Sequence, residues 1–158
     1  METKEYIYFL CDLLTIDIPD IRIKEDGAMA TSYPKENRIC INKDSFHDGL
    51  EYIVIAHEMR HIYQWVAVQE KLEPKRIIKL WEDNFEHYLD SSHTGYENQP
   101  LEIDANAFAY IIIKTLFNRE ITVRCDAKRL NKRIRELLLD FSREEIIESY
   151  TYAMNRFK

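Results

Sequence analysis

The pentapeptide His57-Glu58-Met59-Arg60-His61 lies within a stretch of helical apolar periodicity that runs from Leu50 to Val68. Residues four apart project from the same face of a helix, so His57 and His61 can offer two imidazole nitrogens to one metal ion. Glu58 lies about 100° further round the helix, where its carboxylate can reach a water on that ion. The pattern therefore predicts a zinc site in which Glu58 is the general base.

A catalytic zinc ion needs a third protein ligand and one coordination position left for water. Metzincins, one class of zinc peptidases, need glycine three residues and histidine six residues after the second motif histidine. Here Gln64 and Ala67 occupy those positions, which excludes that class. The third ligand must come from elsewhere, and the downstream candidates are Glu82, Glu86, His87, His93, Glu97, Glu102 and Asp104.

Glu102 is the preferred candidate because it stands in the first turn of a helix expected from Pro100 to Phe117. Alanines three and seven residues further on share its face, which leaves room for the motif helix to approach closely. Asp104 points nearly opposite and is not expected to bind the same ion. Asn106, one turn beyond Glu102, is a candidate hydrogen-bond partner for the ligand. An ordinary helix-dipole role for the Glu102 carboxylate stays open.

The motifs His57-Glu58-x-x-His61 and Glu102-x-x-Ala105-Asn106-x-Phe108-Ala109 together resemble the ImmA/IrrE-type zinc metallopeptidases. The resemblance covers about residues 35–65 and 98–112, including an expected strand before the motif helix. It implies a minimal, gluzincin-like zincin fold and one Zn²⁺ per chain, held by His57, His61 and Glu102. It also implies a zinc-bound water activated by Glu58, and a protein substrate such as a regulatory or repressor protein in a bacterium or phage-type element.

Arg60 departs from that family, which usually has glycine before the second histidine. An arginine there is expected to contact substrate or to cap the nearby surface. The oxyanion formed during hydrolysis also needs a hydrogen-bond donor. His93 and Tyr96, in an expected loop from Asp90 to Gln99, are the candidates, with Tyr33 and Arg60 as weaker ones. A surface histidine and a packing tyrosine are the ordinary interpretations.

The remaining patterns predict a mostly helical α+β domain spanning residues 1–158, with a small antiparallel sheet of about three strands beside the zinc-bearing helix pair. The strands are expected at 21–24, 29–33 and 38–42. The helices are expected at 4–14, 48–69, 74–89, 100–117, 126–139 and 142–156.

The whole-chain composition limits the partners. With 46% apolar residues, 32% charged residues and a net charge of −6, the chain is globular, and no nucleic-acid partner is expected. The basic segment Lys128–Arg135 predicts a solvated helix face or a docking surface for an acidic partner. Three scattered cysteines, no signal-peptide pattern and no apolar run long enough for a membrane lead us to expect a cytoplasmic protein with no membrane partner.

Two other interpretations concern the same pentapeptide. Peptide deformylases carry it with an upstream cysteine ligand, but the residues around Cys40 lack the glycines of that family, so a core thiol is expected. The chain could also be a non-catalytic, metal-binding regulatory or interaction module that docks through its basic helix. Substituting Glu58 by glutamine separates the two classes, because only the function of an enzyme depends on that carboxylate.

Overall fold

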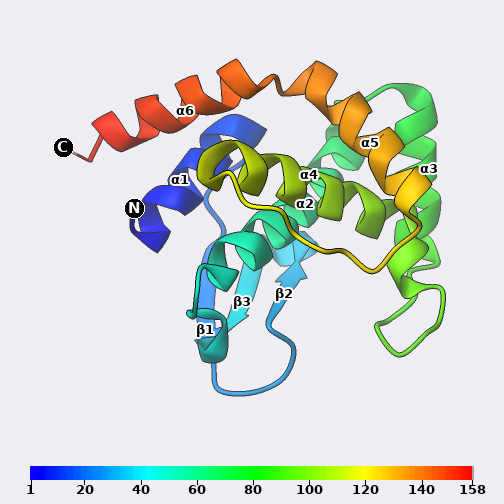
Figure 1. Cartoon of the computed structure of the whole chain (residues 1–158). Helices are drawn as coiled ribbons and strands as arrows, with labels where there is room; N and C mark the ends of the chain where they lie inside the picture. Colours follow the sequence, from blue (N-terminus) through cyan, green and yellow to red (C-terminus); the bar gives the residue numbers. More distant parts are fainter. Residues whose placement is uncertain (158) are drawn as a thin grey trace.

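The structure is a computed structural model that describes residues 1–157, and over these residues the chain forms six α-helices and one three-stranded sheet (Figure 1). The fold is mostly helical α+β, as the sequence predicts. In chain order the elements are α1 (Thr3–Leu14), β1 (Asp20–Lys24), β2 (Ala30–Tyr33), β3 (Arg38–Asn42), α2 (Leu50–Glu70), α3 (Lys75–Glu86), α4 (Pro100–Phe117), α5 (Ala127–Asp140) and α6 (Arg143–Asn155).

The sheet is mixed, and the expectation of an antiparallel sheet is wrong for one of its two pairings. β3 lies in the centre, antiparallel to β2 and parallel to β1. A simple meander would have placed β2 in the centre. β3 takes that place because it is the most apolar strand: Ile39 and Ile41 are fully buried, whereas Ile23 of β1 is exposed. The remaining edge of β2 is left without a strand partner in the sheet.

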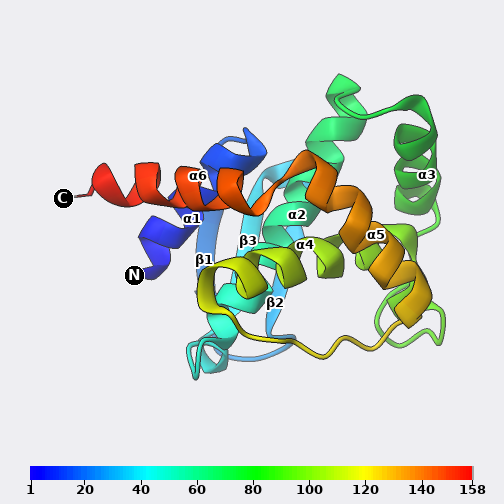
Figure 2. The same ribbon diagram turned by 45° about the horizontal axis from the view of Figure 1, so that its top comes forward.

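Helix α2 lies between the sheet and α4, and this layer holds the main core (Figures 1 and 2). Ile55, Ala56 and Met59 of α2 are fully buried in it. On α4, Ala105 and Ala109 are also fully buried, so the small side chains do allow the two helices to approach each other. Close packing here fixes α4 against the H-E-x-x-H face of α2.

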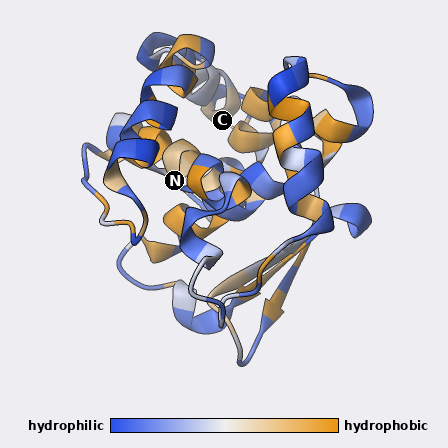
Figure 3. Ribbon diagram, turned by 90° about the vertical axis from the view of Figure 1, so that its right-hand side faces the viewer, coloured by the Kyte–Doolittle hydropathy of each residue, from blue (hydrophilic) through white to orange (hydrophobic). Residues whose placement is uncertain are grey.

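The C-terminal helices close the other side of the core. Asp126 caps α5 by accepting a hydrogen bond from the Arg129 amide, and Ser142 caps α6 by accepting one from the Glu145 amide. Figure 3 shows hydrophobic and hydrophilic segments alternating along the helices, as expected where one face packs on the core. Among the helices of residues 1–157, none combines the length and apolar character that crossing a membrane requires.

Helix α3 is shorter than the sequence predicts. It ends at Glu86 instead of continuing to about residue 89, because the chain turns at His87. The side chain of Gln99 then holds the returning loop: its Oε1 accepts from the Leu89 amide at 2.7 Å, and its Nε2 donates to the Leu89 and Tyr96 carbonyls at 3.0 Å. This clamp places two tyrosines, Tyr88 and Tyr96, beside the first turn of α4.

Candidate metal centre

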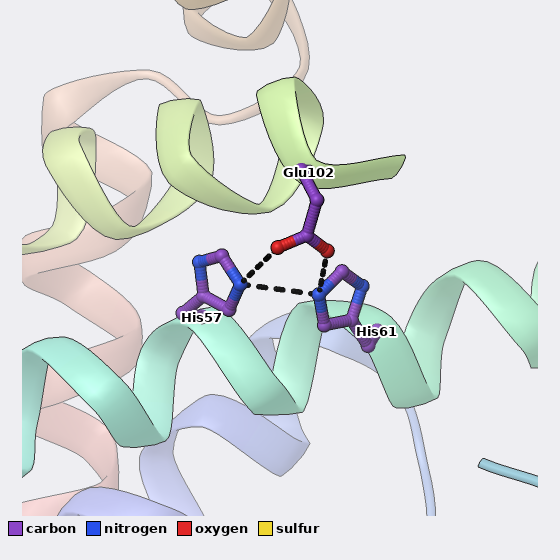
Figure 4. Close-up of side chains that lie close together, drawn as sticks. All are labelled: His57, His61 and Glu102. Carbon is purple, nitrogen blue, oxygen red and sulfur yellow. Dashed lines mark hydrogen bonds and ion pairs between the residues drawn. The ribbon is translucent and has the colours of Figure 1, made fainter. Parts of the chain in front are cut away.

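The side chains of His57 and His61 project from one face of α2 toward Glu102 in the first turn of α4 (Figure 4). The two Nε2 atoms are 3.1 Å apart. Glu102 reaches both rings, with Oε1 at 3.2 Å from His57 Nε2 and Oε2 at 2.7 Å from His61 Nε2. The helical spacing of the histidines and the close α2–α4 packing therefore bring together the three residues singled out in the sequence.

These three side chains form a group that could hold a metal ion. Their donor atoms all lie within 4.8 Å of one another. Ligand atoms at about 2.0–2.1 Å from a tetrahedral ion are separated by roughly 3.3 Å, close to the spacings found here. Two imidazoles and one carboxylate also match the donor set of catalytic zinc sites. The residues present thus fit a metal ion in both spacing and chemistry.

The orientation of His61 is fixed from behind by Gln64. The Gln64 amide nitrogen donates to the Leu101 carbonyl at 2.9 Å and to Asp104 Oδ2 at 2.7 Å. The side-chain oxygen of Gln64 therefore faces His61 Nδ1 at 2.8 Å. Because this oxygen can only accept, Nδ1 must carry the proton of the hydrogen bond. In the neutral ring the other nitrogen, Nε2, then has no proton, and its lone pair on the side of Glu102 is free to bind a metal ion.

Burial and mutual attraction oppose each other in the electrostatics of the group. Burial alone lowers the pKa of His61, but the charge of Glu102 and the hydrogen bond to it outweigh this and raise that pKa to about 9. Burial likewise opposes ionisation of Glu102, yet His61 and His57 hold its pKa far below the usual range. Without a cation between them, the carboxylate thus retains a proton on His61.

Glu58 lies in a pocket of about 400 Å³ that we call the β2 cleft. Its other lining residues come from the β2 edge, from α2 and from the loop after α3, and include Thr31, His61, Tyr88 and Tyr96. The expected base and one expected metal ligand therefore face the same cavity.

Two tyrosines of the clamped loop stand over Glu102. The Tyr88 hydroxyl donates to Glu102 Oε2 at 2.9 Å, and the rings of Tyr88 and Tyr96 meet edge to face at 6.1 Å. Burial and the charge of Glu102 raise the pKa of both tyrosines, so each keeps its proton near neutral pH. The sequence indicated Tyr96 but missed Tyr88, which the apolar spacing assigned to helix α3.

The structure does not bring His93 to the cleft. Its side chain is exposed, and its Nδ1 accepts a hydrogen bond from the Gly95 amide of the same loop. Asn106 is half-buried and lines a separate pocket on the far side of His57 and Glu102. In the described part of the chain, Tyr88 and not Asn106 supplies the side-chain hydrogen bond to Glu102 from outside the group.

Arg60 is fully buried, which contradicts the expectation that it contacts substrate or caps the surface. Its Nε donates to Asp104 Oδ2 at 2.8 Å, and Arg133 of α5 donates to Asp104 Oδ1 at 2.7 Å. The guanidinium carbon of Arg60 also lies 4.5–5.8 Å from the ring centres of Tyr63, Trp81, Phe108 and Phe141. Arg60 is thus a buried residue, enclosed by α4, α5 and four aromatic rings that contact its guanidinium group.

We call Arg60, Asp104, Arg133 and Glu136 the arginine network. Glu136 completes it by accepting from Arg133 Nη1 at 2.8 Å. Burial opposes the charge on Asp104, but Arg60 and Arg133 bring its pKa down to about 2. The network takes Arg133 out of the basic segment 128–135, whose exposed basic residues are Lys128, Arg129, Lys132 and Arg135.

Cys40 is half-buried on β3, so the expectation of a core thiol is only partly met. Within residues 1–157, the group able to hold a metal consists of His57, His61 and Glu102 and does not include this cysteine. In comparisons with protein-family models, with curated proteins and with solved structures, nothing matched this chain. The site is therefore interpreted from its own geometry and chemistry.

Proposed function

We propose that this protein is a zinc-dependent metallopeptidase. The observation that carries the proposal is the convergence of His57, His61 and Glu102 beside a cleft that also contains Glu58. The spacing of the donors suits zinc, and the base is the residue that the H-E-x-x-H pattern assigns. The resemblance to the ImmA/IrrE-type metallopeptidases extends the proposal to a cytoplasmic enzyme whose substrate is a regulatory or repressor protein.

The edge of β2 supports a peptide as the substrate. β2 pairs with β3 on one side only, and its residues Ala30, Thr31 and Ser32 line the β2 cleft opposite Glu58 and His61. An extended peptide can pair with a free strand edge through main-chain hydrogen bonds, whatever its sequence. Such pairing would draw a peptide bond along the cleft toward the candidate metal ligands.

Each residue of the site has a separate task in this proposal. Zinc held by His57, His61 and Glu102 would lower the pKa of a coordinated water and polarise the carbonyl to be cleaved. Glu58 accepts the proton of the attacking water and passes it to the leaving amine. The Tyr96 hydroxyl keeps its proton and Tyr96 lines the same cleft, so it is the donor for the negative charge that develops on the carbonyl oxygen, whereas the Tyr88 hydroxyl already donates to Glu102.

The first test is metal content, measured by elemental mass spectrometry on protein purified without added metal. We expect about one zinc per chain in the wild type and its loss in Glu102→Ala, because two imidazoles alone make an incomplete site. Glu70→Ala, which removes an exposed carboxylate at the end of helix α2, is the control and should retain the metal. A wild type that stays metal-free after zinc is offered would refute the proposal.

The second test separates an enzyme from a metal-binding module. Zinc-loaded wild type and Glu58→Gln are incubated with a peptide mixture, and new termini are identified by mass spectrometry. We expect both proteins to bind zinc but Glu58→Gln to cleave at least about 100-fold more slowly, the usual loss when a general base is removed. Equal products from both proteins, or none from a zinc-loaded wild type, would exclude hydrolysis by this site.

A further inference from the structure

A second pocket, of about 510 Å³, lies beside the β2 cleft, one helical turn beyond His61. The two cavities share Ser32, Pro34 and Phe85 in their walls, so they are direct neighbours. The side wall of the second pocket is aromatic: the rings of Trp65 and Phe85 meet edge to face with centres 5.3 Å apart. We call it the Trp65 pocket.

Two carboxylates on the rim of the Trp65 pocket take part in no ion pair within the described residues. Glu82 and Glu86 are exposed, lie one turn apart on α3 and both line the pocket. In the described part of α3 the ion pair joins Lys79 to Asp83 and leaves both glutamates out. Like charges at this spacing repel each other, so a cation placed between them and the aromatic wall would relieve an unfavourable contact.

The chain itself shows that a cation fits against this wall. The ammonium group of Lys35 lies 5.2 Å from the centre of the Trp65 ring. Lys35 belongs to the short 3-10 turn Pro34–Glu36 between β2 and β3, and the same turn lines the pocket. An aromatic face, two free carboxylates and an ammonium already resting on the ring are the features of a site for a basic side chain.

We propose that the Trp65 pocket binds a lysine or arginine side chain of the peptide substrate and so sets cleavage specificity. This inference rests on the proposed peptidase function and adds a substrate class to it. His57, His61 and Trp65 form one stripe on α2, in which each step of four residues advances about 6 Å. Alternate side chains of an extended peptide are separated by about 6.6 Å. A side chain two residues from the one above His61 therefore reaches the Trp65 pocket.

The test compares cleavage sites in a peptide mixture of balanced composition. Zinc-loaded wild type should cleave where lysine or arginine occupies one fixed position two residues from the side chain over His61. The Glu82→Gln/Glu86→Gln double variant should lose most of that preference, by about tenfold, while still cleaving neutral peptides. Asp83→Asn, which removes an exposed carboxylate of α3 outside the pocket lining, should leave the preference unchanged.

A binding measurement makes the inference independent of turnover. Zinc-loaded Glu58→Gln is titrated with peptides that carry lysine or norleucine at the selected position, and tryptophan fluorescence is followed. Trp65 is half-buried in the pocket wall, whereas Trp81 is almost fully buried, so the change on binding reports mainly on Trp65. The lysine peptide should bind about tenfold more tightly, and Glu82→Gln/Glu86→Gln in the same background should remove the difference.

The outcomes separate the two proposals. Cleavage without a preference for basic residues, or a preference that survives the double variant, overturns the Trp65 pocket and leaves the peptidase standing. Failure of zinc-loaded wild type to cleave overturns the peptidase. In that case lysine-dependent binding that the double variant removes still supports the pocket as a site for basic peptides, and its absence overturns the pocket as well.

Discussion

Two charged clusters join the same pair of helices, yet they satisfy their charges in different ways. The candidate metal centre uses His57 and His61 of α2 with Glu102 of α4, and the arginine network uses Arg60 of α2 with Asp104 of α4. The network is closed: two guanidinium groups meet two carboxylates, and Asp104 is 1% exposed. The candidate metal centre borders two pockets: His61 lines the β2 cleft, and His57, whose side chain is 16% exposed, lines the pocket that contains Asn106.

This difference distinguishes a structural cluster from one that can exchange its cation. In the network the opposite charges are paired within the protein: Arg60 and Arg133 pair with Asp104, and Arg133 also pairs with Glu136. In the candidate metal centre the positive charge is a proton on His61, which a bound metal ion would have to displace. Neighbouring positions on the same two helices therefore differ in the cation that balances the carboxylate. Asp104 is paired with the guanidinium group of Arg60, whereas Glu102 is paired with a proton on His61.

The largest effect is expected when the closed cluster is opened. Asp104→Asn leaves the Arg60 guanidinium buried without its counterion, and we expect a loss of about 3–5 kcal/mol in the free energy of unfolding. Urea denaturation of the metal-free protein measures it. Asp83→Asn, at an exposed position on α3, should change stability by less than about 0.5 kcal/mol. Similar stabilities for the two variants would show that the network does not hold α2 to α4.

The pH dependence of stability should differ between the clusters. The pKa of His61 is about 9 in the folded protein, against an ordinary value of 6.5 for the unfolded chain. The contribution of protonated His61 to the free energy of unfolding is therefore complete below pH 6.5 and is lost as the pH rises through 9. We expect a fall of up to about 3 kcal/mol in that window for metal-free protein. The contribution of Asp104 has the opposite sign: it is present above pH 3.8 and is lost as pH falls through 2.

Urea denaturation between pH 6 and 10, with a chelator present, checks the alkaline limb. His61→Gln should flatten that limb, because the variant has no imidazole to deprotonate at this position. A wild-type profile as flat as that of the variant would contradict the strong coupling between His61 and Glu102. With saturating zinc the limb should also disappear, since the ion replaces the proton.

A smaller effect is expected at the residue that links the clusters. Gln64 contacts His61 on one side and Asp104 on the other, at 2.8 and 2.7 Å. Gln64→Met keeps the side-chain volume but removes both hydrogen bonds, and we expect zinc affinity to fall by about 10–100-fold. Competition titration with a zinc chelator measures this affinity. Gln69→Met, at an exposed position on the same helix, is the control and should bind zinc as the wild type does.

The smallest effect is expected at the outer end of the arginine network. Glu136 is 29% exposed in its pairing with Arg133, so water can replace much of what the carboxylate supplies. Glu136→Gln should cost less than about 1 kcal/mol in urea denaturation. A loss as large as that of Asp104→Asn would mean that the network depends on its outer carboxylate as much as on its buried one.

Local patterns were sufficient to predict most elements and the three candidate ligands. The four-residue spacing of His57 and His61 places both on one helix face, and Glu102 follows from helix position and from the small residues around it. The order of the strands could not be predicted, because it depends on which strand buries best against α2. The burial of Arg60 could not be predicted either, because its partner Asp104 lies 44 residues away in the sequence, on α4.

Tyr88 shows a different limit. Its spacing continues the apolar pattern of α3, so the sequence assigns it to that helix. The helix ends at Glu86, and a glutamine ten residues beyond Leu89 determines where the chain goes next. Contacts of this kind follow from the assembled fold and leave no periodic signal. The sequence therefore predicts only some of the side chains that surround the candidate metal centre.

The Gln99 clamp divides the loop into a fixed part and a variable part. It joins Leu89 to Tyr96, so the segment 90–95 projects beyond a closed base. Asp90 and Ser91 in that segment line the β2 cleft, whereas Tyr88, which contacts Glu102, lies outside it. During evolution, insertions or deletions between Asp90 and Gly95 could therefore reshape the β2 cleft without disturbing the candidate metal ligands.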